Sequence, residues 1–211
     1  MNDPAASPPP DARVFVVDDD RSCLTSVSRL LRAAGFAVST FTSATDFLAI
    51  AKPDLAGCVV SDLKMPEMDG MALQQALAQA GSNLPIVFLT GHGDIPTTVQ
   101  AIRRGAEDFL TKNAPGEQLI AAVRRAIARN KEDRAERSRV LALRQPFQRL
   151  STRELEVLRH VVQGKLNKQT AAELGIHERT VKFHRTAITT KLGVQSVPDL
   201  IRMVEAAGLF D

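Results

Sequence analysis

The chain of 211 residues contains no Trp, no Tyr and only two Cys, and each shortage argues against a class of protein. Nine Phe are the only bulky aromatic residues, so the chain has few platforms on which unpaired bases could stack, and a single-strand nucleic-acid binder is disfavoured. Cys23 falls in a predicted helix and Cys58 in an apolar run. We therefore expect reduced, packed thiols rather than a structural disulfide.

Long hydrophobic runs are also missing. No apolar stretch approaches the roughly 20 residues that a membrane-spanning helix needs. The first twelve residues are rich in Pro and Ala but lack the apolar segment of a signal peptide. We expect a disordered tail at residues 1–12, no membrane partner and a cytoplasmic location.

Charge is divided unevenly along the chain. Residues 1–123 hold nine Lys and Arg against fourteen Asp and Glu, a balance of −5, whereas residues 124–211 hold eighteen against ten, a balance of +8. The length suits two small domains. We therefore expect an acidic domain joined to a basic one that binds a polyanion, for which duplex DNA is the favoured candidate.

Strand-like and helix-compatible segments alternate in the acidic part. Five apolar runs begin near residues 14, 36, 57, 84 and 108, and a helix-compatible segment follows each. This alternation predicts right-handed crossovers and a parallel sheet covered on both faces, over residues 13–123. From Gly116 the helical pattern continues through an arginine-rich stretch until Pro146 must end it. We interpret residues 124–147 as a helical linker rather than a DNA-contacting arm.

Four of the apolar runs end in polar residues that suit one site, namely Asp18 with Asp19, Asp62, Thr90 and Lys112. In an open parallel sheet, ligands bind where the carboxyl ends of neighbouring strands meet. Three carboxylates in one place raise one another's pKa unless a cation intervenes, and Mg²⁺ accepts carboxylate and phosphate oxygens. The pattern therefore predicts a magnesium site that handles a phosphoryl group.

Each polar residue has an expected role. Asp62 stands alone at its strand end and is the expected nucleophile, whose attack on a donor phosphate gives an acyl phosphate. Lys112 supplies a positive charge to a phosphoryl oxygen. The hydroxyl of Thr90 can hydrogen-bond another phosphoryl oxygen only once phosphate is present, so phosphorylation would be able to move the loop that carries it.

These motifs resemble the receiver domain of bacterial two-component response regulators, and most closely its FixJ branch, over about residues 13–130. The resemblance implies a flavodoxin-like (βα)5 fold and phosphorylation of Asp62 by a sensor histidine kinase. The segments that carry it are Val17-Asp18-Asp19-Asp20, Ser61-Asp62-Leu63-Lys64-Met65-Pro66-Glu67-Met68-Asp69-Gly70, Leu89-Thr90-Gly91-His92-Gly93-Asp94 and Asp108-Phe109-Leu110-Thr111-Lys112.

The same resemblance implies further roles. Asp19, Asp62 and the backbone carbonyl of Lys64 would bind Mg²⁺, with Asp18 assisting through water. Thr90 and Phe109 would rearrange together on phosphorylation. Dimerisation through the face of the fourth helix and fifth strand would follow.

One departure from the family pattern lies beside Lys112. The family places proline next, often after a cis peptide bond, whereas Asn113 and Ala114 precede Pro115 here. We therefore expect a trans bond and an altered reach of the lysine. The departure motivates an alternative, in which the receiver takes no phosphate and the chain is a constitutive DNA binder or docking module.

A remoter alternative is a phosphatase of the haloacid-dehalogenase type, because Asp18 and Asp20 fit its D-x-D pattern as nucleophile and acid/base. We instead expect Asp20 and Asp69 to cap helices. His92 lies between two glycines with no other metal ligand nearby, so we assign it no metal role. A regulator rather than an enzyme is expected.

The basic part begins with a helix-start signature. Ser151-Thr152-Arg153-Glu154 is a capping box. Asn167 suits an N-cap, and a helix from it would end at Leu174 before Gly175. A helix at 178–192 follows this tight turn, and a last helix at 197–206 closes the module. Two helices joined by a short Gly-containing turn predict a helix-turn-helix.

The helix at 178–192 has two faces. Val181 and Ile188 lie on a packing face, where we also place His184 in a structural role. The residues of the opposite stripe are suited to DNA contacts, because Arg and Lys reach guanine edges or phosphates, Thr reaches a base edge or a thymine methyl group, and Phe contacts that methyl group. The expected stripe is Arg179, Lys182, Phe183 and Thr186.

Residues 148–211 resemble the LuxR-type four-helix DNA-binding domain. The resemblance rests on Leu150–Leu158, Asn167–Ile176, Thr180–His184 and Lys191–Gly193. It implies double-stranded promoter DNA, a dimer on paired half-sites and phosphate contacts from Thr180 and Lys182. His177 replaces the usual Ser or Thr before the recognition helix, which predicts a weaker N-cap. We expect a transcription factor that is switched by phosphorylation of Asp62.

Overall fold

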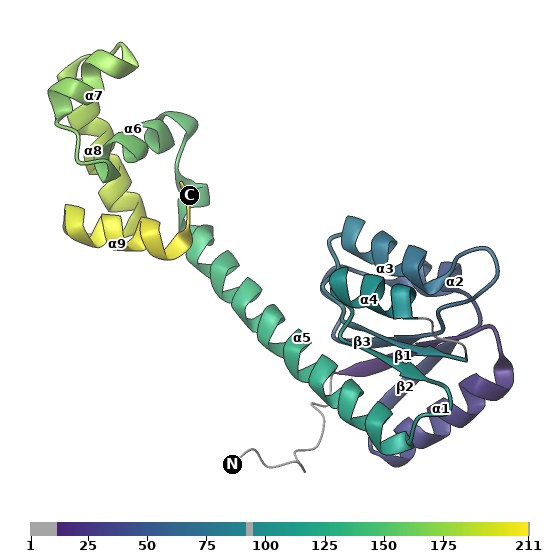
Figure 1. Cartoon of the computed structure of the whole chain (residues 1–211). Helices are drawn as coiled ribbons and strands as arrows, with labels where there is room; N and C mark the ends of the chain where they lie inside the picture. Colours follow the sequence, from purple (N-terminus) through teal and green to yellow (C-terminus); the bar gives the residue numbers. More distant parts are fainter. Residues whose placement is uncertain (1–11, 92–94, 211) are drawn as a thin grey trace. The chain divides into compact units, whose positions relative to one another are not determined.

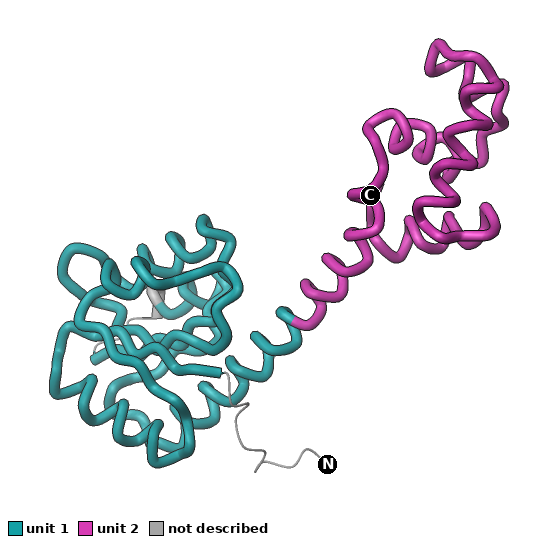
Figure 2. The backbone as a smooth tube through the Cα atoms, turned by 180° about the vertical axis from the view of Figure 1, so that it is seen from behind, with its two compact units in different colours: residues 1–134 teal, residues 135–211 magenta. Residues whose placement is uncertain are grey.

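The computed structural model of the chain describes residues 12–91 and 95–210 (Figure 1). The expected tail at 1–12 lies outside the described residues except for Ala12, which is buried in the first unit, and His92 also lies outside them. The chain forms two compact units, Met1–Arg134 and Ala135–Asp211 (Figure 2). Each has its own hydrophobic core.

The first unit contains one five-stranded sheet in which all neighbouring strands are parallel. Its order is β2-β1-β3-β4-β5, so the order reverses between β1 and β3, which is where ligands bind in such sheets. The prediction of a parallel five-stranded sheet is confirmed. The strands are β1 (Arg13–Val17), β2 (Ala37–Phe41), β3 (Gly57–Ser61), β4 (Ile86–Thr90) and β5 (Asp108–Thr111).

Helices cover both faces of this sheet (Figure 1). Val14 and Val16 of β1 join the core under α1 and α5, whereas Phe15 and Val17 join the core under α2, α3 and α4. Successive strand residues point to opposite faces, so these central strands are apolar throughout. The helices are α1 (Arg21–Ala33), α2 (Ala44–Ile50), α3 (Gly70–Gln79), α4 (Ile95–Arg103) and α5 (Gly116–Arg144).

Helix caps next to the strand ends were predicted correctly. The side chain of Asp20 accepts a hydrogen bond from the Ser22 N–H at 2.8 Å and caps α1. Asp69 caps α3 by accepting from the Ala72 N–H at 2.7 Å. Because its carboxylate caps a helix, Asp20 is not available as the acid/base that the phosphatase alternative requires.

The second unit is helical. A buried cluster that includes Val181, Ile188 and Leu200 holds its helices together. Ser151 and Glu154 form the predicted capping box of α6. The prediction of Asn167 as an N-cap was wrong: Leu166 takes that position, and its N–H donates to Oε1 of Gln169 at 2.9 Å. The elements are η1 (Gln145–Arg149), α6 (Thr152–Val162), α7 (Asn167–Leu174), α8 (Glu178–Leu192) and α9 (Val197–Ala207).

Helix α5 is long and belongs to both units, since the boundary falls between Arg134 and Ala135. Within the second unit, the Arg144 guanidinium donates to the carbonyls of Ala207 at 2.8 Å and Gly208 at 2.7 Å. A cation suits the C-terminal end of α9, where carbonyls lack helical partners. None of the helices among residues 12–91 and 95–210 has the length and apolar character needed to span a bilayer.

Candidate functional site

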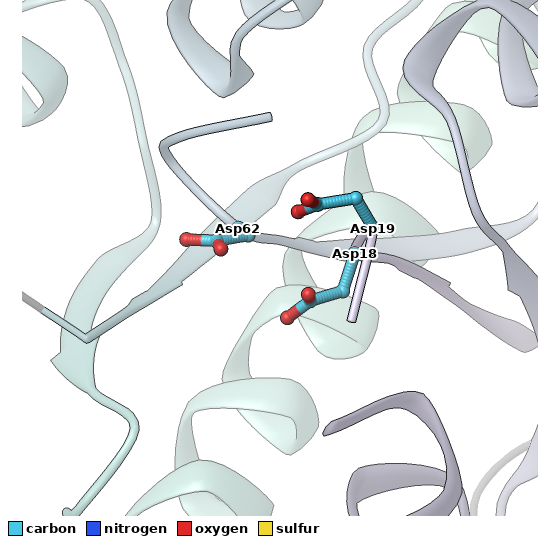
Figure 3. A group of neighbouring side chains, drawn as sticks. All are labelled: Asp18, Asp19 and Asp62. Atoms are coloured by element: carbon cyan, nitrogen blue, oxygen red, sulfur yellow. The ribbon is translucent and has the colours of Figure 1, made fainter. Parts of the chain in front are cut away.

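Three carboxylates gather where β1 and β3 end. Asp18 and Asp19 follow β1 directly, and Asp62 follows β3 (Figure 3). The pairing of Val17 with Ser61 puts the two strand ends side by side. One carboxylate oxygen from each of the three residues lies within 4.8 Å of the other two. The sequence-predicted cluster is therefore assembled by the register of two neighbouring parallel strands.

Asp62 is held firmly at this strand end. It is 8% exposed, and its Oδ1 accepts from the Leu63 N–H at 2.6 Å and the Lys64 N–H at 3.4 Å. The Ser61 hydroxyl donates to the Asp62 carbonyl at 2.8 Å. These bonds fix the carboxylate and leave Oδ2 for other partners. Fixed orientation favours a nucleophile, because less freedom is lost on reaction.

Lys112 joins two of the three carboxylates. Its Nζ lies 2.7 Å from Oδ2 of Asp18 and 2.8 Å from Oδ2 of Asp62. Burial alone lowers the pKa of Lys112, but the hydrogen bonds to the two carboxylates outweigh burial and raise it above its ordinary value. Three carboxylates and one ammonium still leave an excess of negative charge. A divalent cation with oxygen ligands fits this donor set.

Lys112 contacts the cluster although no proline directly follows it. The peptide bond after Lys112 is trans, as we expected for a bond before Asn113. The lysine nevertheless reaches both carboxylates, because the Lys112 N–H donates to the Thr90 carbonyl at 2.7 Å and fixes the end of β5 beside β4. A following proline is therefore not required for Lys112 to contact both carboxylates.

The loop from β3 to α3 is tightly packed around Asp62. A Cβ at Gly70 would lie 2.4 Å from the Asp62 carbonyl oxygen and 2.8 Å from Cε1 of Phe88, so only glycine fits there. The Gly70 N–H donates to the Leu63 carbonyl at 2.9 Å. Glu67 in the same loop has a φ of 62°, a left-handed conformation that is strained for a residue with a Cβ.

The two predicted switch residues lie on adjacent strands. Thr90 ends β4 and is 1% exposed. Phe109 of β5 is half-buried against the core beneath α2, α3 and α4, with its ring centroid 6.2 Å from that of Phe88. Thr90 therefore ends the strand next to β3, and Phe109 lies on the strand beyond it, while their joint rearrangement on phosphorylation remains a prediction.

Cys23 is a neighbour of the cluster that the motifs did not reveal. It lies in the first turn of α1, five residues after Asp18. Burial, followed by a hydrogen bond to the Asp18 carboxylate, raises the pKa of its thiol to about 12. The only sequence signal is its spacing from Asp18, which a strand-to-helix turn brings together.

Helix α8 presents the predicted stripe to the outside. Arg179, Lys182 and Thr186 are exposed, and the Thr186 hydroxyl donates to the Lys182 carbonyl at 3.2 Å. Thr180 is half-buried at the start of the helix, where His177 provides no side-chain cap, as predicted. The stripe is thus a basic surface on a helix whose opposite face is buried.

Phe183 stands out on this surface because 70% of its side chain is exposed. Its ring contacts the ring of His184 edge-on, with centroids 5.9 Å apart. His184 is half-buried, and no described residue hydrogen-bonds to its buried Nδ1. A large apolar side chain exposed among cations favours contact with a partner that offers both phosphates and apolar groups.

Comparison with known proteins agrees with both parts of this geometry. Residues 14–124 match the response regulator receiver domain, and residues 148–204 match the luxR family of bacterial regulatory proteins. The chain belongs to the two-component response regulators of the FixJ/NarL type. Its similarity to individual members extends through both domains.

Three response regulators illustrate that similarity. TodT of Pseudomonas putida is 43% identical over 192 residues, covering 91% of this chain and 85% of TodT. The solved structure of StyR is 45% identical with a TM-score of 0.74, covering 92% of this chain and 98% of StyR. Full-length FixJ from B. japonicum is 33% identical with a TM-score of 0.55, covering 95% and 98% of the two chains. This response regulator is accordingly a two-component transcription regulator.

Proposed function

We propose that Asp62 is the phosphoacceptor of this response regulator, and that its phosphorylation by a sensor histidine kinase controls binding to promoter DNA. The observation that carries the proposal is the bridge from Lys112 to Asp18 and Asp62 at 2.7 and 2.8 Å. That ammonium already lies where a phosphoryl group on Asp62 would need a positive charge.

The reaction follows from the positions of these residues. Oδ2 of Asp62, which contacts the Lys112 ammonium at 2.8 Å, attacks the phosphorus of a phosphodonor; the new O–P bond forms, and the bond to the donor's leaving group breaks. Lys112 then exchanges its contact with the carboxylate for one with a phosphoryl oxygen. The Thr90 hydroxyl donates a hydrogen bond to a second phosphoryl oxygen. Phe109 moves together with Thr90 as β4 and β5 adjust.

Magnesium is the proposed cofactor. Asp19, Asp62 and the backbone carbonyl of Lys64 would hold it, with Asp18 assisting through water. When bound, the ion neutralises charge on the transferring phosphoryl group. The surplus of carboxylates over ammonium groups at this strand end supports the assignment.

In the second unit we propose that Arg179, Thr180, Lys182, Phe183 and Thr186 contact double-stranded promoter DNA. Residues 124–147 would connect the phosphorylated domain to this surface. A homodimer formed on phosphorylation would present two such surfaces to paired half-sites. Each step passes the chemical change at Asp62 to a different part of the chain.

A labelling experiment tests the phosphoacceptor. The full chain is incubated with radiolabelled small phosphodonor and Mg²⁺, alongside Asp62→Asn and the control Asp54→Asn, which removes an exposed carboxylate from a loop. We expect label on the wild type and the control, and none on Asp62→Asn. Label that persists on Asp62→Asn would contradict the proposal and favour a nucleophile such as Asp18.

A gel mobility shift with the same three proteins tests the link to DNA. We expect the phosphodonor to change the DNA affinity or the oligomeric state of the wild type and of Asp54→Asn, but not of Asp62→Asn. If the wild type takes label but shows no change in either property, the receiver works as a docking module and the second unit binds DNA constitutively.

A further inference from the structure

One buried polar atom of the first unit has no hydrogen-bond partner. Gln74, in the middle of α3, is 8% exposed, and no described residue donates a hydrogen bond to its Oε1. Its Nε2 donates to the Arg104 carbonyl at 3.2 Å. This bond fixes the amide, because the reversed orientation would bring two oxygens together. A buried acceptor without a donor is unfavourable, so a donor from another molecule would be favoured at Oε1.

A cavity of about 270 Å³ lies beside Gln74. It is bounded by α3, the start of β4, the turn after α4 and one side of α5. A neighbouring hollow of about 380 Å³ shares the side of α3 and Arg104 with it. We call the first feature the α3–α5 cavity, and its principal lining residues are Gln74, Leu77, Leu84, Ile86, Arg104 and Arg129.

The α3–α5 cavity lies at the opposite end of the strands from the carboxylate cluster. Ile86, the first residue of β4, lines the cavity, whereas Thr90, the last, lies at the edge where β3 leads into Asp62. The strands are parallel, so their starts and their ends lie at opposite edges of the sheet. A ligand in the cavity would therefore be separate from the phosphoryl chemistry.

The two cations that line the α3–α5 cavity differ in their pairing. Arg129 lies 3.3 Å from a carboxylate oxygen of Glu107 and 3.9 Å from one of Asp133. Arg104 is exposed and forms no ion pair among the described residues. One guanidinium is therefore left without a counter-charge at the cavity. A guanidinium binds a carboxylate through two parallel hydrogen bonds, so a carboxylate is a suitable ligand for Arg104.

The rest of the cavity wall is largely apolar. Leu77, Leu84 and Ile86 contribute to it, together with Pro85. An occupant therefore needs an apolar body between the group that binds Arg104 and the group that reaches Gln74. A neutral donor is favoured at Gln74, because a charged ammonium would be much costlier to move out of water.

We propose that the α3–α5 cavity binds a small organic carboxylate that also carries a hydroxyl group. The carboxylate binds the Arg104 guanidinium, and the hydroxyl donates a hydrogen bond to Oε1 of Gln74. Because Oε1 is buried, the amide turns about its last side-chain bond to meet the ligand, and this torsion is soft in glutamine. The hydrogen bond between Gln74 and the Arg104 carbonyl keeps the two contact residues next to each other.

A buried water is the rival occupant. It could donate to Oε1 of Gln74 and bind a second polar group such as the hydroxyl of Ser82, which also lines the cavity. Water would leave Arg104 without a counter-charge. The two occupants differ in whether a carboxylate is bound, and in whether its hydroxyl is recognised by Gln74.

Binding of small acids to the full chain tests the proposal. The probes are ω-hydroxyhexanoate and para-hydroxybenzoate, with hexanoate and benzoate lacking the hydroxyl, and hexanol and phenol lacking the carboxylate. Isothermal titration calorimetry measures each affinity for the wild type, Gln74→Met and Arg104→Met. The matched controls are Gln75→Met, at a residue that lines only the neighbouring hollow, and Arg103→Met, at a residue that lines neither. Thermal unfolding verifies that every variant is folded.

We expect at least one of the two hydroxy acids to bind the wild type and both controls about tenfold more tightly than its parent acid, because a buried acceptor gains its donor. Gln74→Met should bind the hydroxy acid no better than the parent acid. Arg104→Met should lose the preference for the acids over hexanol and phenol. In wild-type NMR spectra, the side-chain amide signals of Gln74 should shift with the hydroxy acid and stay in place with the parent acid.

Three results would overturn the proposal. If the wild type binds neither hydroxy acid better than its parent, and the Gln74 amide signals do not move, the cavity holds water alone. If the preference for the hydroxy acid persists in a folded Gln74→Met, the hydroxyl is bound elsewhere. If Arg103→Met loses as much affinity as Arg104→Met, the acids are attracted to the basic surface rather than bound in the cavity. The NMR measurement decides the matter even if Gln74→Met does not fold.

Discussion

The carboxylate cluster of the receiver and the basic surface of α8 both bring like charges together, but only the cluster has a counter-charge of its own. Lys112 binds Asp18 and Asp62 within one domain. Around α8, Lys182 and Arg179 have no such partner among the described residues. The carboxylate cluster, whose charge Lys112 compensates, suits a switch in which the lysine exchanges one partner for another. The surface of α8, whose charge is not compensated, suits binding of an external polyanion.

The largest expected effect comes from removing the uncompensated charge. We expect Arg179→Ala/Lys182→Ala to bind a duplex selected from a random pool by the wild-type protein at least about 100-fold more weakly, because each contact to a base edge is worth about 1–3 kcal/mol. Its free energy of unfolding should change by less than about 0.5 kcal/mol, since neither side chain packs or pairs. Fluorescence anisotropy and urea unfolding measure the two quantities. A large loss of stability would contradict the comparison.

Removing Lys112, the counter-charge of the carboxylate cluster, should instead lower the stability of the protein. Without Mg²⁺, we expect Lys112→Met to lower the free energy of unfolding by about 1–3 kcal/mol, because Asp18 is 2% exposed and loses its only ammonium among the described residues. Mg²⁺ should then stabilise the variant more than the wild type, by binding the native state.

The matched control is Lys64→Met, which removes an exposed lysine two residues from Asp62. It should unfold with the wild-type free energy, with and without Mg²⁺. If Lys112→Met is as stable as the wild type in the absence of metal, then Lys112 does not compensate the cluster.

Local features of both regions were predictable from the sequence. Asp20 and Asp69 are caps because a short carboxylate before a helix accepts from its first N–H groups. The cluster of Asp18, Asp19 and Asp62 was predictable because parallel strands end at one edge of the sheet. Asn167 was mispredicted because Gln169 reaches back to the Leu166 N–H, so a competing contact moved the cap by one residue.

Contacts between residues far apart in the chain that no strand-end pattern marks were not predictable. Arg144 binds the end of α9, 63 residues away, and buried Asn130 accepts from the Gly57 N–H at 3.1 Å, 73 residues away. No periodicity reports such a pairing, because it depends on packing between elements. Lys112 differs from these two, because its place at the carboxylate cluster was predicted from the strand end, and the register of β4 and β5 holds it there without a following proline.

A paired lysine on α8 sharpens the comparison within a single helix. Lys191 lies 2.7 Å from the buried Glu154, and this hydrogen bond, with one from the Ser151 N–H, lowers the pKa of Glu154. We expect Lys191→Met to lower the free energy of unfolding at pH 7 by about 0.5–1 kcal/mol, reduced by the exposure of the ammonium. Unlike Arg179→Ala/Lys182→Ala, Lys191→Met should keep nearly all of its DNA affinity.

The pH dependence of this effect has a definite sign. A carboxyl whose folded pKa is depressed contributes stability above its unfolded value of about 4.3, and that contribution is lost as pH falls through the folded pKa. The difference between wild type and Lys191→Met should therefore be full at pH 7 and shrink below about pH 4. Urea unfolding at a series of pH values measures it, and a difference that grows in acid would contradict the assignment.

The smallest effect concerns backbone strain, which also distinguishes the two regions. Glu67, five residues after Asp62, is the only non-glycine residue with a positive φ among residues 12–91 and 95–210. Relief of a left-handed conformation is worth about 1–2 kcal/mol, and the added freedom of glycine in the unfolded chain cancels about 0.5–1 kcal/mol of it.

We expect Glu67→Gly to raise the free energy of unfolding by about 0.5 kcal/mol, whereas Asp54→Gly, in a loop without positive φ, should lower it. If Glu67→Gly is more stable but takes label from the phosphodonor more slowly, the strain serves the phosphorylation site; if its labelling rate is unchanged, the strain belongs to the loop alone.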